Sequence, residues 1–297
     1  MKYSYDYAVI GGDMRQVYLA EELACGSKSV CFYALCGTPA KQLCFTGAQI
    51  CEAISLEAAC QEAEYILCPI PFCRQEGLLN QSAVNQELPV SEILSGMKSG
   101  QTFFAGCIPE SFRLKAEDTG VKVFDLMQDT ELSYFNTIAA AEGAVCEAIS
   151  CSPVNLHQSL CAVLGYGKCG RTICHYLKGM YARVYAFSNE EKELAEAGLI
   201  TEKTGLLKDF NALAGEFDFI FNTIPAQVIN SEILKTIKPH TAIIDIASAP
   251  GGVDYSAAKK LERRAVFCPG LPGKYAPYSS AKAVWKTIQK ILQEQRG

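Results

Sequence analysis

Short apolar runs, rich in β-branched and aromatic residues, alternate with amphipathic stretches of helical length along the whole chain. This alternation is typical of βαβ units, in which crossover helices join parallel strands. In the first half, strands are predicted at 7–10, 30–33, 65–68, 102–105 and 121–124, with helices near 14–25, 55–63, 91–97 and 109–118. In the second half, strands are predicted at 160–164, 184–187, 217–221, 242–246 and 265–268. The pattern predicts an α/β fold with two Rossmann-like, doubly wound parallel-sheet domains.

Two further helical patterns organise the chain around these domains. Residues 131–150 are predicted to form a long connecting helix, which Cys151-Ser152-Pro153 then breaks. Residues 279–295 carry apolar or small side chains close to helical spacing and are predicted to pack back on the first domain. The expected organisation is a flavodoxin- or Rossmann-like substrate and partner domain at 1–130, the connecting helix at 131–150, an NAD(P)-binding domain at 151–277 and a returning helix at 278–297.

The composition is that of a globular protein, and its charge is unevenly divided. The 297 residues are 49% hydrophobic and carry a formal net charge of -5. Residues 1–150 hold 9 Lys and Arg against 19 Asp and Glu, whereas residues 151–297 hold 18 against 13. The second half is therefore the better place for an anion, although its excess is too small and scattered for a nucleic-acid surface. Neither a membrane span nor a signal peptide is predicted.

Cysteine is unusually frequent in the first quarter of the chain. Eight of the 15 cysteines lie there: Cys25, Cys31, Cys36, Cys44, Cys51, Cys60, Cys68 and Cys73. No two cysteines have the C-x-x-C spacing that is common in zinc and iron–sulfur sites. Because free cysteine also behaves as a small hydrophobe, we expect no metal site, and thiols that stay reduced in the cytoplasm.

A complete G-x-G-x-x-G sequence follows the strand predicted at 160–164 and opens a helix. In a dinucleotide-binding turn, the first glycine permits the tight bend and the second lets backbone N–H groups approach a pyrophosphate. The third glycine allows the helix to pack closely on the strand, and the helix N-terminus adds partial positive charge. We expect cofactor contacts from Gly165, Tyr166, Gly167, Lys168, Cys169 and Gly170. The alternative is a purely structural glycine-rich turn.

The end of the next strand bears on the choice between NAD and NADP. NAD-binding domains commonly place an Asp or Glu there to bind the ribose hydroxyls, whereas this chain has Ser188 and Asn189. A hydroxyl and an amide suit a 2′-phosphate, and Lys192 follows one turn later. Glu190 and Glu191 argue for NAD. The sequence therefore favours NADP and leaves NAD possible.

A similar turn at the start of the chain is not predicted to bind a second cofactor. It reads Gly11-Gly12-Asp13-Met14-Arg15-Gln16, so that Asp13 and Gln16 stand where the second and third glycines would be. A carboxylate at that place would repel a pyrophosphate, and Asp13 is equally well explained as a helix N-cap. Arg15 lies in the first helical turn, where it is a candidate to bind a substrate carboxylate.

Glycine and proline are dense in the segments that follow the later strands of the second half. Ligands of doubly wound sheets bind beyond the carboxyl ends of the strands. The first of these segments supplies candidate cofactor contacts from Asn222, Thr223, Ile224 and Pro225. The next two contain Ser248, Gly251, Gly252, Gly273 and Lys274, where bare N–H groups suit an anion or a nicotinamide-facing rim. Ordinary turn structure is the alternative for all three.

The three histidines are not expected at the carboxyl edge of the sheet. His157 and His240 precede strands, and His175 lies in the helix after the glycine-rich turn. Hydroxyacid dehydrogenases commonly use a histidine for the alcohol proton, so that chemistry is disfavoured. An oxidation in which hydride loss makes a ring aromatic needs no acid or base for an alcohol proton. The protein has only to accept a C–H proton. Glu142 and Asp13 are the candidate bases, although acidic residues on helices are often simply solvated.

These segments together closely resemble the A-subunit family of dipicolinate synthases over nearly the whole chain. The shared motifs are Ile10-Gly11-Gly12-Asp13 with Arg15-Gln16, Asn136-Thr137-Ile138 with Glu142-Gly143, the glycine-rich turn at 165–170, Asn222-Thr223-Ile224-Pro225, Ala247-Ser248 with Pro250-Gly251-Gly252, and Pro269-Gly270-Leu271-Pro272-Gly273. The cysteine-rich stretch between residues 30 and 100 departs from the family.

The resemblance implies an enzyme of spore formation in the mother-cell cytoplasm. It would work with the flavoprotein-like B-subunit of dipicolinate synthase and convert a dihydrodipicolinate-type precursor, or its hydrated form, to dipicolinic acid with NADP or NAD. A pyridine dicarboxylate needs cations or converging N–H groups for its two carboxylates. Arg15, the Gly251-Gly252 turn and the Gly273-Lys274 segment are the candidates for these, with Asn136, Thr137 and Ser248 as further substrate contacts.

Two other functions stay open. One is a hydroxyacid or amino-acid dehydrogenase of the same two-domain architecture. The other is a nucleotide-binding protein that regulates or assembles a complex while its partner performs the redox step. A homo-oligomer is compatible with each of these functions.

Overall fold

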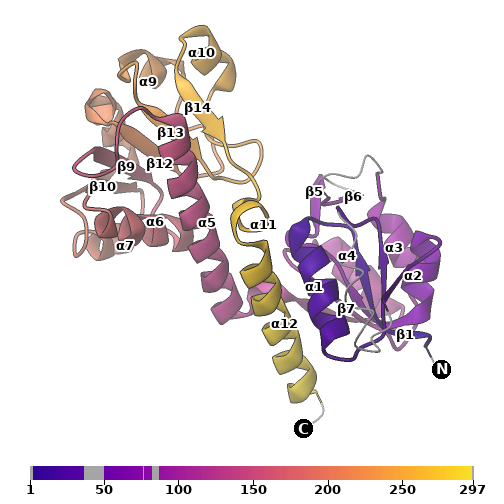
Figure 1. Cartoon of the computed structure of the whole chain (residues 1–297). Helices are drawn as coiled ribbons and strands as arrows, with labels where there is room; N and C mark the ends of the chain where they lie inside the picture. Colours follow the sequence, from indigo (N-terminus) through magenta and orange to yellow (C-terminus); the bar gives the residue numbers. More distant parts are fainter. Residues whose placement is uncertain (1–2, 37–49, 76, 82–86, 296–297) are drawn as a thin grey trace. The chain divides into compact units, whose positions relative to one another are not determined.

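The computed structural model describes residues 3–36, 50–75, 77–81 and 87–295 and divides into two compact units (Figure 1). Unit 1 consists of Met1–Phe135 and Ala276–Gly297, and unit 2 of Asn136–Tyr275. The helix α5 (Thr130–Cys151) begins in unit 1 and continues into unit 2.

Unit 1 is built on a parallel sheet of six strands. These are β1 (Tyr5–Ile10), β2 (Val30–Tyr33), β3 (Ile50–Glu52), β4 (Ala63–Leu67), β7 (Thr102–Ala105) and β8 (Lys122–Asp125). Their order in the sheet is β3-β2-β1-β4-β7-β8, and every pair is parallel. A small antiparallel hairpin, β5 (Cys73–Gln75) and β6 (Leu78–Leu79), lies outside this sheet. The last four residues of β1 are fully buried, as expected for a central strand covered on both faces.

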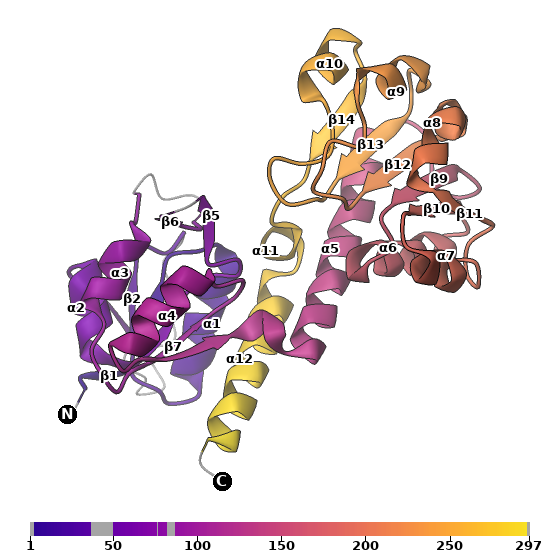
Figure 2. The same ribbon diagram turned by 180° about the vertical axis from the view of Figure 1, so that it is seen from behind.

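Helices cover both faces of this sheet (Figure 2). The bounds in unit 1 are α1 (Met14–Cys25), α2 (Leu56–Glu62), α3 (Val90–Gly96), α4 (Glu110–Asp118), η2 (Leu126–Gln128) and α12 (Pro277–Glu294). One apolar core lies under α1 and α12, and the other lies under α2, α3 and α4. The C-terminal helix α12 packs along α1, and its Trp285 meets Tyr7 of β1 edge to face at 5.7 Å. The predicted return of the C-terminal helix to the first domain is therefore confirmed.

Unit 2 repeats the same parallel topology. Its strands are β9 (Leu160–Leu164), β10 (Arg183–Ser188), β11 (Lys203–Leu206), β12 (Phe219–Asn222), β13 (Ala242–Asp245) and β14 (Arg264–Phe267). Their order, β11-β10-β9-β12-β13-β14, corresponds to the 3-2-1-4-5-6 order of dinucleotide-binding domains. That order places a topological switch point between β9 and β12, at the strand that leads into the glycine-rich turn.

The helices of unit 2 also form two layers. Their bounds are α6 (Lys168–Gly179), α7 (Glu191–Ala197), η3 (Leu207–Asp209), α8 (Phe210–Leu213), η4 (Ala214–Glu216), α9 (Ser231–Thr236), α10 (Tyr255–Lys260) and α11 (Leu271–Tyr275). One core includes side chains of α5, α6, α7 and α11, and the other includes those of α8, α9 and α10. The predicted pair of doubly wound parallel-sheet domains is confirmed.

Two edge strands and the hairpin were not predicted from the pattern. β3 and β11 are three and four residues long, and each leaves at least one residue exposed to solvent. An edge strand loses the continuous apolar character that identifies a central parallel strand. β12 begins two residues later than predicted, because Phe217 precedes the sheet as a buried loop residue.

The thiols of the described residues are those of a structural core or an ordinary surface. Burial raises the pKa of Cys60 and of Cys174 to about 12, which makes these thiols unreactive. Cys44 lies outside the described residues. In the part of the chain that the structure describes, no cluster of three or more potential ligands could hold a metal ion. None of the helices described combines the length and apolar character needed to cross a membrane.

Candidate functional site

The glycine-rich turn of unit 2 connects the central strand β9 to α6. Gly165 has a φ of +86°, a conformation that favours glycine, and its N–H donates to the Phe187 carbonyl at 2.8 Å. A Cβ atom on Gly170 would lie 1.9 Å from the Gly165 carbonyl oxygen. The helix can therefore approach the strand this closely only when residue 170 is glycine.

The N-terminus of α6 is open at the middle glycine. Gly167 is the N-cap residue, and no side chain of the described residues caps the helix there. The nearest atom to a Cβ placed on Gly167 would be Oε1 of Glu193, at 3.9 Å. An uncapped helix N-terminus presents unsatisfied N–H groups and partial positive charge toward this space. The geometry fits the pyrophosphate of a dinucleotide.

Not every residue of this turn can contact a cofactor through its side chain. Tyr166 is fully buried in the core of unit 2, beneath the guanidinium group of Arg171 at 5.6 Å. Its hydroxyl has no hydrogen-bond partner among the residues that the structure describes. Lys168 is exposed, and Cys169 is partly buried, which raises the pKa of its thiol. Tyr166 can therefore contribute to the site through its backbone only.

The end of β10 carries a carboxylate that the sequence pattern did not reveal. Ser188 is buried, and its hydroxyl donates to Oε2 of Glu193 at 2.5 Å. The N–H of Glu190 in turn donates to the Ser188 hydroxyl at 3.1 Å. Asn189 is exposed. Glu193 lies in the first turn of α7, so its carboxylate reaches the strand end although no acidic residue stands at that position.

A buried polar network fixes the ends of β12 and β13. Asp245 is completely buried, and the Asn222 amide donates to its Oδ1 at 2.8 Å. Oδ2 accepts from the Tyr255 hydroxyl and from the Gly252 N–H, each at 2.6 Å. Burial and this carboxylate raise the pKa of Tyr255. Neither Asp245 nor Tyr255 was predicted, and the only sequence signal was an acidic residue ending an apolar strand.

This network already uses groups that were predicted to bind ligands. Asn222 is completely buried, and its amide group donates to Asp245 and to the Ile224 carbonyl and accepts the Ile224 N–H. The N–H groups of Gly251 and Gly252 donate to the Ser248 carbonyl and to Asp245. In this conformation both N–H groups of the Gly251-Gly252 turn are therefore occupied and unavailable to a substrate carboxylate. Ser248 itself is exposed.

The loop after β12 lies next to the glycine-rich turn. Both the N–H and the hydroxyl of Thr223 donate to the Leu164 carbonyl, at 3.0 and 2.9 Å. A Cβ atom on Gly165 would come within 2.4 Å of the Thr223 hydroxyl and 3.0 Å of Ile224. Pro225 is exposed. Thr223 and Ile224 thus border the turn directly, where a cofactor held by it would be contacted.

Two of the three candidates on α5 have side-chain partners within unit 2. Glu142 is exposed and accepts a hydrogen bond from the Tyr176 hydroxyl at 3.0 Å. Thr137 is buried, with its hydroxyl 2.7 Å from that of Thr172. Asn136 is half-buried. The predicted base Glu142 therefore sits beside a phenol on α6 and has a partner for its charge before any substrate binds.

The last substrate candidates lie on α11. Gly273 is buried, and its N–H donates to the Gly270 carbonyl. Lys274 pairs with Glu147 of α5 at 2.5 Å, and its ammonium lies 5.0 Å from the centre of the Tyr275 ring. This pairing raises the pKa of Lys274 and lowers that of Glu147. Lys274 is exposed enough to meet an anion, but only in competition with Glu147.

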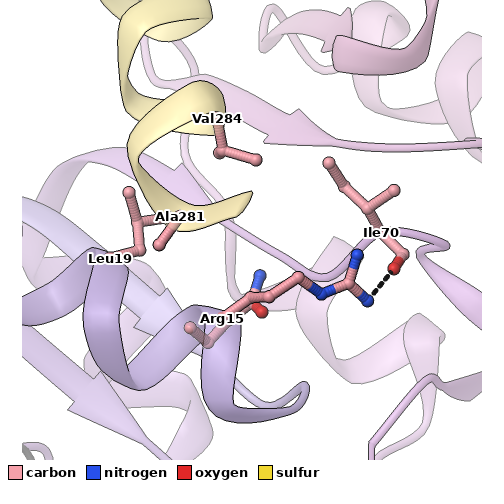
Figure 3. A pocket seen from close by; sticks show the side chains of 6 residues that line it. Arg15, Leu19, Ile70, Ala281 and Val284 are labelled. Carbon is pink, nitrogen blue, oxygen red and sulfur yellow. Dashed lines mark hydrogen bonds between the residues drawn. The ribbon is translucent and has the colours of Figure 1, made fainter. Parts of the chain in front are cut away.

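The corresponding turn of unit 1 is closed. Asp13 caps α1, accepting the Arg15 N–H at 3.0 Å, and it also forms an ion pair with the Arg15 guanidinium at 2.8 Å. Arg15 is only 6% exposed and donates to the Ile70 carbonyl at 2.5 Å (Figure 3). The adjacent pocket, bounded by Arg15, Gln16, Leu19, Ile70, Ala281 and Val284, has a volume of about 10 Å³, which is room for one water molecule. A pyridine dicarboxylate does not fit into it.

The histidines lie where the pattern placed them. His157 and His240 are exposed in the loops before β9 and β13, and His240 lies 3.3 Å from Asp218. His175 is exposed on α6. Parallel strands put these loops at the amino edge of the sheet, opposite the edge that carries the glycine-rich turn.

A family model and a relative matched over nearly the whole chain together show the family. Residues 6–127 match the N-terminal domain of the dipicolinate synthase A-subunit. The A-subunit of dipicolinate synthase from Bacillus subtilis (strain 168) is 30% identical over 291 residues, which cover 97% of this chain and 95% of that protein. The chain belongs to the dipicolinate synthase A-subunit family. The predicted family is thereby confirmed.

Solved structures of this family share the fold of the whole chain. The crystal structure of the dipicolinate synthase A chain from Bacillus subtilis has a TM-score of 0.79 at 27% identity, covering 99% of this chain and 97% of that one. The A-subunit structure from Bacillus halodurans has a TM-score of 0.81 at 24% identity, covering 98% and 99%. Residues 136–266 match the NAD-binding domain of D-isomer specific 2-hydroxyacid dehydrogenases. Unit 2 is thus a Rossmann-type domain for a nicotinamide dinucleotide.

Proposed function

We propose that the chain is the oxidoreductase component of a dipicolinate synthase. It would oxidise dihydrodipicolinate, or its hydrated precursor, to dipicolinic acid during sporulation in the mother-cell cytoplasm. Held by the backbone of the glycine-rich turn, a nicotinamide cofactor would supply the hydride acceptor. The substrate ring would lose a hydride and a proton from neighbouring positions, and the hydrated precursor would also lose a water molecule, so that the product is aromatic. The flavoprotein-like B-subunit of the synthase is the expected partner.

The open N-terminus of α6 carries this proposal. Its bare N–H groups, the accessible space at Gly167 and the tight packing at Gly170 are the features that hold a pyrophosphate. They lie at the carboxyl edge of a 3-2-1-4-5-6 sheet in the part of the chain that matches an NAD-binding domain. The relationship to the Bacillus subtilis A-subunit over nearly the whole chain supports dipicolinate as the product class.

The organisation of the chain suggests that its segments have different functions. In this proposal residues 1–130 are the substrate and partner domain, residues 131–150 connect, residues 151–277 bind the cofactor, and residues 278–297 return to the first domain. The sequence of the β10 end favours NADP, whereas the side chain of Glu193 favours NAD. Thr223, Ile224 and the backbone of the glycine-rich turn are the proposed cofactor contacts, with Lys274 and Asn136 as substrate contacts.

Turnover by the purified full chain tests the proposal. Dihydrodipicolinate, freshly generated, is supplied with NAD⁺ or NADP⁺, and reduced cofactor is followed by its near-ultraviolet absorbance, with and without the B-subunit. Product is identified independently by the ultraviolet absorbance of dipicolinate. We expect oxidation that requires this chain. A chain that binds a dinucleotide but gives no reduced cofactor under either condition would contradict the proposed chemistry.

A nucleotide-binding protein without a redox step is the second candidate. The observation in its favour is that both proposed bases are engaged: Asp13 with Arg15, and Glu142 with Tyr176. It predicts that NAD(P) increases the affinity of the chain for the B-subunit while the isolated chain reduces no cofactor. Pull-down of the B-subunit with and without dinucleotide separates this candidate from the first.

A further inference from the structure

The position of Glu193 bears on which nicotinamide dinucleotide unit 2 selects. Rossmann domains that bind NAD hold the adenosine ribose with a carboxylate at the end of the second strand. In this chain that strand is β10, and its last residue is Ser188. The carboxylate is supplied instead by Glu193 on α7, and the Ser188 hydroxyl holds it there at 2.5 Å.

The orientation of this carboxylate is defined by its two oxygen atoms. Oε2 accepts the hydrogen bond from Ser188, whose own oxygen accepts the N–H of Glu190. Oε1 lies 3.9 Å from the place that a Cβ on Gly167 would occupy. The carboxylate therefore lies between the end of β10 and the second glycine of the turn, which is the side of the pyrophosphate site where the adenosine ribose lies.

A carboxylate at this position distinguishes a ribose diol from a 2′-phosphate. It accepts hydrogen bonds from free hydroxyls, and such charge-assisted bonds are strong. A 2′-phosphate brings like charge to the same place and removes a donor. The guanidinium of Arg171, on the first turns of α6, is paired with Glu196. Its charge is therefore already compensated by a carboxylate before any 2′-phosphate binds.

We propose that Glu193, oriented by Ser188, selects NAD over NADP. This inference rests on the proposed dinucleotide site and deepens it, and it reverses the preference for NADP that Ser188 and Asn189 suggest when the sequence is considered alone. Glu193 is the specificity-determining residue, and Ser188 acts through it as a positioning residue.

Equilibrium binding to the full chain tests the proposal without any turnover. Dissociation constants for NAD⁺ and NADP⁺ are measured by isothermal titration calorimetry on the unmodified chain and on Glu193→Gln. We expect the unmodified chain to bind NAD⁺ at least about tenfold more tightly, because the discrimination depends on hydrogen bonds to a charged group. Glu193→Gln should reduce this ratio by about tenfold, by weakening NAD⁺ and improving NADP⁺.

Three further variants test whether the position of the Glu193 carboxylate, rather than the net charge, sets the preference for NAD⁺. Glu191→Gln makes the same charge change at an exposed position two residues earlier on α7 and should leave the ratio within about twofold. Lys192→Ala removes the exposed cation that would serve a 2′-phosphate and should leave the NAD⁺ affinity unchanged. Ser188→Ala should reduce the preference for NAD⁺ over NADP⁺ less than Glu193→Gln does. It removes the hydrogen bond that orients the Glu193 carboxylate but leaves the carboxylate in place.

The outcomes distinguish this inference from the function on which it rests. Equal or tighter binding of NADP⁺ by the unmodified chain overturns the role of Glu193 and leaves the dinucleotide site intact. An unchanged ratio in a Glu193→Gln protein that unfolds at the wild-type temperature overturns it as well. Binding of neither dinucleotide overturns the proposed function together with the inference.

Discussion

The two units have the same strand order, yet their first βα turns are built for opposite purposes. In unit 2 the N-cap of α6 is Gly167, and the helix N-terminus is left open. In unit 1 the equivalent N-cap of α1 is Asp13, whose carboxylate accepts the Arg15 N–H and pairs with the Arg15 guanidinium. The carboxylate occupies the place where a phosphate would bind, so the same topology gives a cofactor site in one unit and a closed turn in the other.

The third position of the turn differs for a related reason. Gly170 allows α6 to pack against the Gly165 carbonyl. In unit 1 this position is Gln16, and its side chain is buried. A Cβ atom placed on Gly12 would lie 2.8 to 2.9 Å from side-chain atoms of Gln16. A dinucleotide site therefore depends on both an empty N-cap and close helix packing, and neither is supplied by the strand order itself.

Among the variants that test this difference between the two turns, Gly170→Ala should have the largest effect on stability and on dinucleotide binding. The new Cβ would lie 1.9 Å from a backbone oxygen, so that the backbone itself must move. We expect a loss of about 3 kcal/mol or more in the free energy of unfolding, together with loss of dinucleotide binding. Urea unfolding followed by far-UV circular dichroism measures the first effect. The urea midpoint measured by tryptophan fluorescence should change little, because the single tryptophan, Trp285, lies in unit 1.

Gly179→Ala is the matched control for that variant. Gly179 is the last residue of the same helix, and a Cβ there meets no described atom within 4 Å. We expect a change within about 0.5 kcal/mol, or a small gain in stability. A Gly170→Ala protein as stable as Gly179→Ala would show that close packing of α6 on β9 is not what the glycine provides.

Gly167→Asp converts the open turn into a copy of the closed one. The aspartate should cap α6, so the stability should change by only a few tenths of a kcal/mol. Its charge and bulk occupy the phosphate position, and the dinucleotide affinity should fall about 100-fold, or about 2.7 kcal/mol. Calorimetric titration measures this fall. Gly167→Ala adds only a methyl group in open space and should lose much less affinity; equal losses would exclude the charge as the cause.

The sequence predicted both turns, because glycine spacing after an apolar run is a local signal. It also placed most central strands, since their burial on both faces makes them continuously apolar. It did not predict the role of Glu193, which reaches the β10 end from the first turn of the following helix. Nor did it predict that Asn222 would be sequestered by Asp245, because that contact depends on the pairing of β12 with β13. Tyr166 lies within the motif, yet its side chain points into the core.

Arg15→Met tests what the buried guanidinium contributes to the stability of the closed turn in unit 1. The substitution keeps most of the side-chain volume but removes the donors to Asp13 and to the Ile70 carbonyl. A nearly buried acceptor left without its donor should cost about 2 kcal/mol, seen as a lower urea midpoint in Trp285 fluorescence. Arg171→Met, which breaks a partly exposed ion pair with Glu196 on unit 2, should cost less than about 1 kcal/mol.

The affinity of the Arg15→Met protein for dipicolinate tests whether Arg15 contacts the substrate. A folded variant that binds dipicolinate normally would remove Arg15 from the substrate contacts, and the guanidinium would then have a structural role, bonded to the Asp13 carboxylate and the Ile70 carbonyl.

Asp13→Gly, the reverse of Gly167→Asp, should have the smallest effect on dinucleotide binding. Glycine replaces aspartate at an N-cap at a cost of a few tenths of a kcal/mol, but the nearly buried Arg15 guanidinium also loses its charge partner, so the expected total loss of stability is about 3 kcal/mol. Opening the N-cap should still create no second dinucleotide site, because Gln16 keeps the third position filled. Calorimetry should therefore give one dinucleotide per chain. A stoichiometry of two would mean that the capping carboxylate alone separates the two turns, and that helix packing at the third position contributes little to the difference between the units.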